Sequence, residues 1–126
     1  MLKKTLLASL LSLLLCACTQ QAAPPTAAQI TAAENARPFD AEISAIYQRS
    51  CISCHTTISS KAPLVGFAPD WQARLPQGMD LLIQHVREGY KAMPAKGFCS
   101  DCSNQDFKKL IEFMSTPVAA KQATKE

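Results

Sequence analysis

The stretch Cys51-Ile52-Ser53-Cys54-His55 decides what kind of fold this chain can adopt. Residues three apart on a helix lie on one face, so two thiols at this spacing can bond the two vinyl groups of one porphyrin. The histidine that follows can then present its imidazole to the iron. This C-x-x-C-H pattern is the attachment signature of c-type haem. We therefore predict that Cys51 and Cys54 bind one haem c covalently and that His55 is an iron ligand.

Two other interpretations of the cysteines remain open from the residues alone. A C-x-x-C motif can be a thiol redox pair, but that motif normally follows a strand, and no convincing strand precedes Cys51. Alternatively, Cys51 and Cys54 could bind zinc together with Cys99 and Cys102. The segment between the two pairs is, however, much longer than the roughly 15–20 residues usual for four-thiolate sites. Neither site needs the histidine that follows Cys54.

Helical patterns flank the motif on both sides. Before it, Asp40 is a plausible N-cap of a helix that leads into the motif. A buried stripe is expected along this helix and places both motif cysteines on the buried face: Ile43, Ile46, Tyr47, Ser50, Cys51 and Cys54. Near the other end of the chain, Ser103 can cap a helix that has Asp106 in its first turn. Its inward stripe is Phe107, Leu110, Ile111 and Met114.

Three methionines follow the N-terminal leucine run, and one of them lies in a predicted loop. Met79 and Met114 lie on apolar helical stripes and are expected to pack in the core. Met93 comes after Gly89, which can end a helix, and before Pro94, which favours an extended backbone. A loop can present a thioether to the haem face opposite the histidine, so we predict Met93 as the second axial ligand. Ligation by histidine and methionine saturates the iron and raises its reduction potential.

Other polar side chains are weaker candidates for the site. His85 would give bis-histidine ligation, but its position indicates a partly exposed helical residue. Trp71, Tyr90 and Arg74 carry polar hydrogens that can reach a buried propionate of the haem. We predict that Trp71 and Tyr90 help to bind the haem in this way. Ordinary packing or solvation explains each of these three equally well. The lysines at 61, 91 and 96 are expected at the rim, where they are solvated or steer an acidic partner.

The N-terminal third predicts export and membrane attachment. The chain has 126 residues, a formal net charge of +3 and 48% apolar residues, many of them leucines that follow Lys3 and Lys4. We interpret residues 1–17 as a signal peptide, since the apolar run is too short to span a bilayer comfortably. Leu15-Cys16-Ala17-Cys18 resembles a bacterial lipobox, which predicts lipidation of Cys18; the alternative is a soluble protein cut a few residues later. Several acyl chains would hold the protein firmly on a membrane.

The rest of the chain divides into three expected parts. Residues 18–37 are rich in Ala, Gln, Thr and Pro and are predicted to form a lipid-anchored flexible tether, of which Ala27 to Ala36 is helical at most in part. Residues 38–116 form the folded domain, and residues 117–126 are predicted to be a disordered tail. Removal of the N-terminal lysines leaves scattered charges near neutrality, so no nucleic-acid partner is expected. We expect the protein on the periplasmic side of a bacterial membrane.

The run Met93-Pro94-Ala95-Lys96-Gly97-Phe98-Cys99-Ser100-Asp101-Cys102-Ser103 resembles the cytochrome c5 subclass of class I c-type cytochromes. Ala62-Pro63-Leu64-Val65-Gly66, Trp71 and Gly78-Met79-Asp80 extend the resemblance over residues 38–116. It implies an all-α fold, a small helical domain wrapped around one covalently attached haem. It also implies a disulfide between Cys99 and Cys102 and supports Met93 as the ligand. After His55, residues 56–61 depart from the more glycine-rich stretch of that subclass.

These features predict an electron carrier rather than an enzyme. Such a monohaem cytochrome would carry single electrons between redox proteins of a respiratory chain, at the membrane or in the periplasm. One alternative is the electron-transfer subunit of a periplasmic dehydrogenase or reductase. A ligand-binding haem sensor or weak peroxidase would require Met93 to be absent from the iron. A zinc-binding lipoprotein is the remaining alternative.

Overall fold

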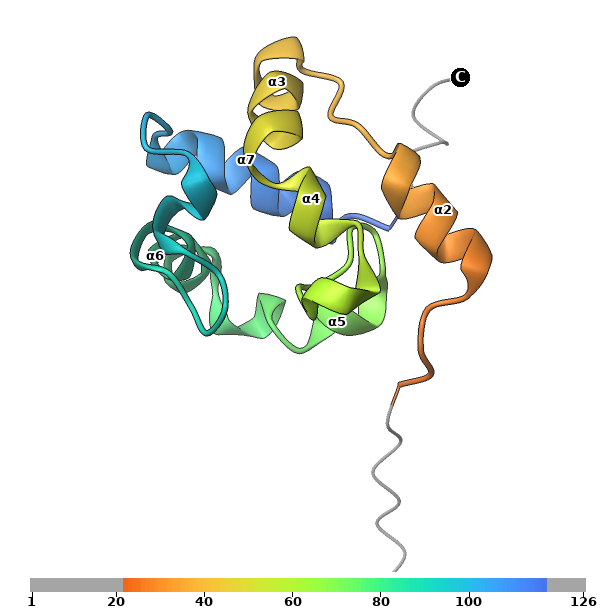
Figure 1. Ribbon diagram of the computed structural model, residues 1–126. Coiled ribbons are helices and arrows are strands. Elements are labelled where there is room, and N and C mark those ends of the chain that lie inside the picture. Colours follow the sequence, from red (N-terminus) through yellow and green to blue (C-terminus); the bar gives the residue numbers. More distant parts are fainter. Residues whose placement is uncertain (1–21, 118–126) are drawn as a thin grey trace, which may run out of the picture.

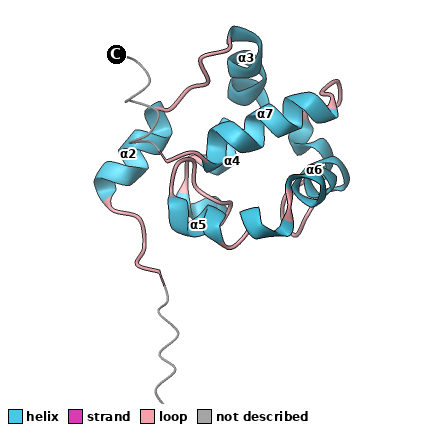
Figure 2. Ribbon diagram, turned by 180° about the vertical axis from the view of Figure 1, so that it is seen from behind, coloured by secondary structure: helices cyan, strands magenta, loops and turns pink. Residues whose placement is uncertain are grey.

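All regular structure in the described part of the chain, residues 22–117 of a computed structural model, is helical (Figures 1 and 2). The α-helices are α2 (Ala27–Asn35), α3 (Ala41–Ser50), α4 (Ile52–His55), α5 (Ala68–Gln72), α6 (Met79–Glu88) and α7 (Asn104–Ser115). The 3₁₀ helices are η2 (Ile58–Ser60), η3 (Leu75–Gln77) and η4 (Ala95–Phe98). The predicted all-α class is therefore confirmed. The predicted signal peptide, Cys18 and nearly all of the predicted tail lie outside the described residues.

The two predicted helix caps are both present. The Asp40 side chain accepts hydrogen bonds from the backbone N–H groups of Glu42 and Ile43 at the start of α3, at 3.0 and 3.1 Å. At the start of α7, Ser103 and Asp106 form a reciprocal capping box. These bonds satisfy N–H groups that have no partner within their own helix.

The first and last helices of the domain form the centre of the core. α3 packs across α7 (Figure 1), and the rings of Tyr47 and Phe113 meet edge to face with centroids 5.1 Å apart. The predicted inward stripe of α7 is confirmed, since its members are each no more than 4% exposed: Phe107, Leu110, Ile111 and Met114. Met114 is thus a core residue, as expected. The crossing brings the C-terminal end of α3, and with it the cysteine motif, over the centre of the domain.

α6 lies beside α7 and carries the segment that follows it. Leu82 is buried, and Met79, Ile83 and Val86 are partly buried against the core, so Met79 packs on an apolar stripe as predicted. The helix ends at Gly89, as predicted, and α6 makes extensive contacts with η4. α6 therefore positions the loop that contains Met93.

The segment before the domain is more ordered than a flexible tether would be. Residues 27–35 form α2, which Thr26 and Gln29 cap reciprocally, and Ala33 is fully buried. Residues of α2 line a small apolar groove together with residues 66–69 and Pro117. Ala has high helix propensity, but so short a helix needs tertiary contacts, and the sequence pattern did not reveal them. None of the helices within residues 22–117 is long and apolar enough to cross a membrane.

Candidate haem centre

The two motif cysteines lie on one helical turn that starts where α3 ends. Cys51 separates α3 from α4, and its carbonyl accepts the backbone N–H of His55 at 3.1 Å. Cys51 is half-buried, and Cys54 is exposed on the turn that follows it. Neither thiol is paired with another cysteine of the described residues.

The state of these thiols argues against the two alternative sites. Burial raises the pKa of the Cys51 thiol to about 11. The attacking thiol of a redox-active C-x-x-C pair has a lowered pKa, which Cys51 lacks. A four-thiolate zinc site is excluded because Cys99 and Cys102 are joined in a disulfide.

His55 is buried, and a hydrogen bond to a nearby backbone carbonyl fixes the orientation of its ring. Its Nδ1 lies 2.9 Å from the carbonyl oxygen of Pro63, which makes Nδ1 the protonated donor and leaves the lone pair on Nε2. Burial lowers the pKa of His55, which favours the neutral ring that a metal requires. The His55 carbonyl accepts the N–H of Val65 at 2.9 Å. The imidazole is therefore prepared to ligate iron through Nε2.

The loop after His55 is held by Trp71 and Asp70, of which only Trp71 was predicted to matter. The indole N–H donates to the Leu64 carbonyl at 2.8 Å, and the Asp70 carboxylate accepts the Leu64 N–H at 2.8 Å. Trp71 also stacks near His55, with ring centroids 6.4 Å apart. The indole N–H is thus already used, so its predicted bond to a propionate is not supported. Trp71 instead supports the loop that orients His55.

Tyr90 contributes to the site differently from the prediction. Its ring is 44% exposed and stacks on His85 at a centroid distance of 4.0 Å. His85 is a half-buried residue of α6, as the sequence indicated. The backbone of Tyr90 pairs with Met93 through two hydrogen bonds of 3.0 Å each. Contact of the Tyr90 hydroxyl with a propionate stays a prediction, and Arg74 donates to the Asp70 carbonyl.

Met93 lies at the end of a tight turn and is half-buried. Lys91, with φ of 56°, turns the chain between the paired residues Tyr90 and Met93. A Cβ atom placed on Gly97 would lie 3.2 Å from the Met93 Cε atom. The thioether therefore lies directly against Gly97, where a side chain would crowd it. Ligation of iron by Met93 stays a prediction.

The predicted disulfide between Cys99 and Cys102 is confirmed, with Cα atoms 5.4 Å apart. Arg49, at the end of α3, was not expected here. One of its nitrogens lies 2.8 and 2.9 Å from the two carboxylate oxygens of Asp101 and 3.3 Å from the Cys99 sulfur. An arginine fifty residues away in sequence has no local pattern that would reveal this contact. It ties α3 to the disulfide turn.

The rim lysines adopt unusual backbone conformations. Lys61, Lys91 and Lys96 all have left-handed φ values of 56–59°. The Lys91 ammonium lies 5.3 Å from the centroid of the Tyr90 ring, and the Lys96 ammonium donates to the Ser100 carbonyl at 2.9 Å. Their proposed role in steering a partner stays a prediction.

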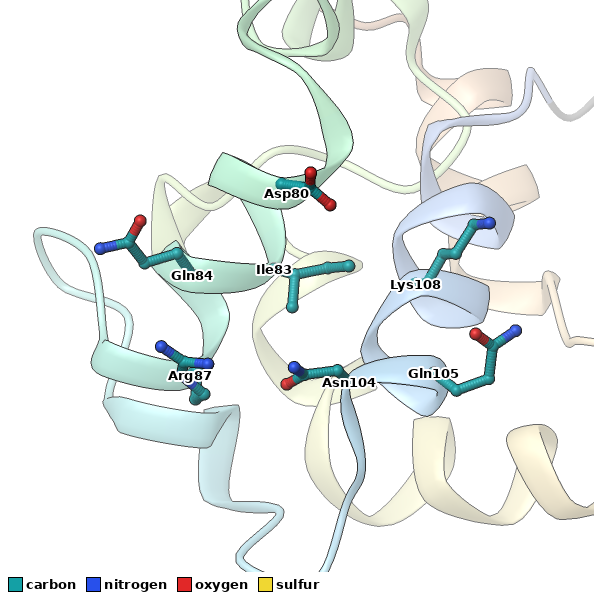
Figure 3. Close-up of a pocket in the computed structure, with 7 residues that line it drawn as sticks. All are labelled: Asp80, Ile83, Gln84, Arg87, Asn104, Gln105 and Lys108. Atoms are coloured by element: carbon teal, nitrogen blue, oxygen red, sulfur yellow. The ribbon is translucent and has the colours of Figure 1, made fainter.

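A separate open groove of about 420 Å³ lies between α6 and α7 (Figure 3). Its lining is mainly charged or amide-bearing: Asp80, Ile83, Gln84 and Arg87 from α6, and Asn104, Gln105 and Lys108 from α7. Figure 3 shows Ile83 on the side of α6 that faces α7. This lining includes none of the predicted haem residues, so the groove is not the haem centre.

The donor set fits haem c. Two unpaired thiols and an imidazole nitrogen with a free lone pair lie on one helical turn, and a half-buried thioether lies on a loop that α6 supports. Cys51 and Cys54 would hold the haem through thioether bonds, and His55 and Met93 would be the iron ligands.

Comparisons with known proteins agree with this donor set. The family model described as "Cytochrome C oxidase, cbb3-type, subunit III" matches residues 39–114. Cytochrome c5 of Azotobacter vinelandii is 38% identical over 72 residues, which cover 56% of this chain and 87% of that protein. Cytochrome c-555 of Chlorobaculum tepidum is 43% identical over 68 residues, or 50% of this chain and 63% of that protein.

Two solved structures are similar in fold. A mono-haem ferrocytochrome c from Shewanella putrefaciens has a TM-score of 0.54 and 41% identity, covering 60% of this chain and 93% of that one. A chain from the electron transfer complex of nitrite reductase with cytochrome c has a TM-score of 0.52 and 26% identity. It covers 62% of this chain and 95% of that one. Each of these four proteins is matched over 50–62% of this chain, and the family model leaves residues 1–38 and 115–126 unmatched.

Proposed function

The chain belongs to the class I c-type cytochromes, with one covalently bound haem c, and from this premise we propose where and how it carries electrons. It carries single electrons between redox proteins of a respiratory chain, on the periplasmic side of a bacterial membrane. A lipid at Cys18 holds it there. The site is that of a carrier and not of an enzyme, because a saturated iron leaves no position for substrate.

The observation that carries the proposal is the fixed imidazole of His55, which directly follows Cys54 on the helical turn that holds both motif thiols. The hydrogen bond from Nδ1 of His55 to Pro63 fixes the ring without a rearrangement on binding. The haem supplies a reversible one-electron iron couple. His55 and Met93 would bind the iron, and the buried loop around Leu64 and Trp71 would keep water from His55. Met93 on the iron would raise the reduction potential relative to bis-histidine ligation.

Visible spectra of the oxidised and reduced holoprotein test the ligands. The wild-type protein should show the ferric sulfur-to-iron absorption band, and Met93→Ala should lose it. Met79→Leu is the matched control, because Met79 is also half-buried but lies on α6 in the core. Retention of the band in Met93→Ala would refute the assignment. Rapid binding of CO to untreated reduced protein would instead support a ligand-binding haem sensor.

Membrane attachment rests on residues 1–18 and needs its own test. The leucine run and Leu15-Cys16-Ala17-Cys18 support a lipoprotein signal. Wild-type protein should incorporate labelled fatty acid and sediment with membranes, whereas Cys18→Ala should do neither. Cys16→Ala is the matched control and should behave as wild type. Membrane attachment of Cys18→Ala would refute the anchor.

A second candidate function is supported by one similar structure, whose cytochrome c is bound to nitrite reductase. This chain would then serve as the electron-transfer partner or subunit of a periplasmic reductase or dehydrogenase. Co-purification of a larger catalytic chain at constant stoichiometry would favour this candidate. Isolation as a free carrier would favour the first.

A further inference from the structure

The disulfide between Cys99 and Cys102 closes the turn between the Met93 loop and α7, and the haem does not use it. We propose that this disulfide is a thiol-exchange site, which a dithiol reductant opens in the folded protein, and that its opening loosens the loop that presents Met93. The first part is independent of the haem ligands. The second part rests on the proposed ligation by Met93.

The two sulfurs differ in accessibility, and this sets the direction of attack. Cys99 is fully buried, whereas Cys102 is half-buried, so an incoming thiolate reaches the Cys102 sulfur. The leaving group is then the Cys99 sulfur, 3.3 Å from a guanidinium nitrogen of Arg49. Asp101 lies 3.4 Å from the same sulfur, but its carboxylate is paired with Arg49. A guanidinium beside the leaving sulfur stabilises the thiolate as the S–S bond breaks.

The exchange balances with a dithiol as the only co-reactant. The first thiolate of the reductant forms a bond to the Cys102 sulfur, and the electron pair of the S–S bond leaves with the Cys99 sulfur, which takes up a proton. The second thiolate of the reductant then attacks the reductant sulfur that is bonded to Cys102. This step closes the disulfide of the reductant and releases Cys102 as a thiolate, which is also protonated. Two electrons and two protons pass to the protein, and the reductant becomes a disulfide.

The backbone before the disulfide is strained, which favours opening. Lys96, Gly97 and Phe98 have consecutive left-handed φ values of 59°, 55° and 65°. Only glycine adopts this region without cost, and a bulky aromatic residue there is a genuine outlier. The Phe98 side chain is 76% exposed, so burial of its ring does not compensate for the strain. Opening of the disulfide allows this backbone strain to relax.

The same strained residues contact the thioether. Gly97, whose Cβ position lies 3.2 Å from the Met93 Cε atom, is two residues before Cys99. The Cys99 N–H donates to the Lys96 carbonyl at 2.9 Å, so the disulfide and this hydrogen bond close the turn together. When the disulfide opens, Lys96 and Phe98 are free to leave the left-handed region. Gly97 then moves away from Met93, and the position of the thioether is no longer fixed.

The test uses the holoprotein treated with dithiothreitol and then alkylated. Two alkyl groups should appear on the peptide that contains residues 99–102, while far-ultraviolet circular dichroism shows unchanged helix. After alkylation and reoxidation of the haem with ferricyanide, the ferric sulfur-to-iron band should fall by at least half. Arg49→Gln should slow the reduction about tenfold, the size expected for one charge-assisted contact. Arg87→Gln is the matched control, because Arg87 pairs with Glu88 and not with the disulfide.

Each outcome decides one part of the proposal. Alkylation that appears only when the helices unfold, or equal rates for Arg49→Gln and wild type, would overturn the exchange site. Alkylation with the band fully retained would overturn the link to Met93. Absence of the band before any treatment would refute the proposed ligation by Met93, and the count of alkylated cysteines would still decide the exchange site.

Discussion

Two glycines flank α6 with the same backbone conformation, and they provide a test of the Met93 loop. Gly78 has φ 90° and ψ 149°, and Gly89 has φ 88° and ψ 152°. This region is accessible essentially only to glycine. The surroundings differ: a Cβ on Gly78 meets nothing within 4 Å, whereas one on Gly89 would lie 3.0 Å from the Met93 carbonyl oxygen and 3.1 Å from the Ala95 nitrogen.

Alanine at either position should therefore carry the same backbone cost, and only one variant should add a clash. Gly78→Ala should lower the free energy of unfolding by about 1–3 kcal/mol, the cost of a residue in such a region. Gly89→Ala should lower it by a further 1–3 kcal/mol or so, because the contacts are with backbone atoms that cannot rotate away. The clash should also displace Met93, so that the ferric sulfur-to-iron band weakens in Gly89→Ala alone.

Urea unfolding followed by circular dichroism gives the stabilities, and the oxidised spectrum gives the ligation. Equal losses of stability in Gly78→Ala and Gly89→Ala would refute the steric argument. A full band in Gly89→Ala, together with the extra loss of stability, would show that the loop yields without moving the thioether. Loss of the band in both variants would place its cause in α6 rather than in the contact with Met93.

Three further changes test the core, a cap and a buried phenol. Met114→Ala should lower the free energy of unfolding by about 2–5 kcal/mol because this side chain is 4% exposed in the core; a loss below about 1 kcal/mol in urea unfolding would contradict the packing. Hydrogen bonds from the backbone and side chain of Ser103 lower the pKa of Asp106 below 3.8, so its stabilising effect is present above this pH and is lost as the pH falls through the lowered value. Asp106→Asn should flatten the acid limb of a stability profile measured by urea unfolding, and a limb as steep as in wild type would refute this. Tyr47→Phe should leave the melting temperature unchanged or raise it, because the buried Tyr47 hydroxyl has no hydrogen-bond partner within residues 22–117; a marked decrease would reveal one.

Local patterns explain why the helices of the domain were predictable. Asp40 and Ser103 cap helices through bonds to residues two or three positions away, and such signals are contained in the sequence itself. The inward stripe of α7 follows from helical periodicity in the same way. Gly89 ends α6 because the chain there needs a positive φ.

The features that sequence did not reveal depend on contacts between distant residues. Ala33 is fully buried although its neighbours look like a linker, because its partners lie in the domain. Arg49 contacts Cys99, fifty residues later. Trp71 was assigned to the haem, but the nearer Leu64 carbonyl uses its N–H. In each case the residue type was informative, and the identity of its partner required the fold.

The position of α2 determines where mechanical load from the N-terminal side enters the domain. This helix precedes residues 39–114, the part that the family shares, and it borders residues 66–69. That stretch directly follows the loop in which the Pro63 carbonyl holds the imidazole of His55. A pull on the chain before Thr26 is therefore transmitted first to the loop whose Pro63 carbonyl orients His55.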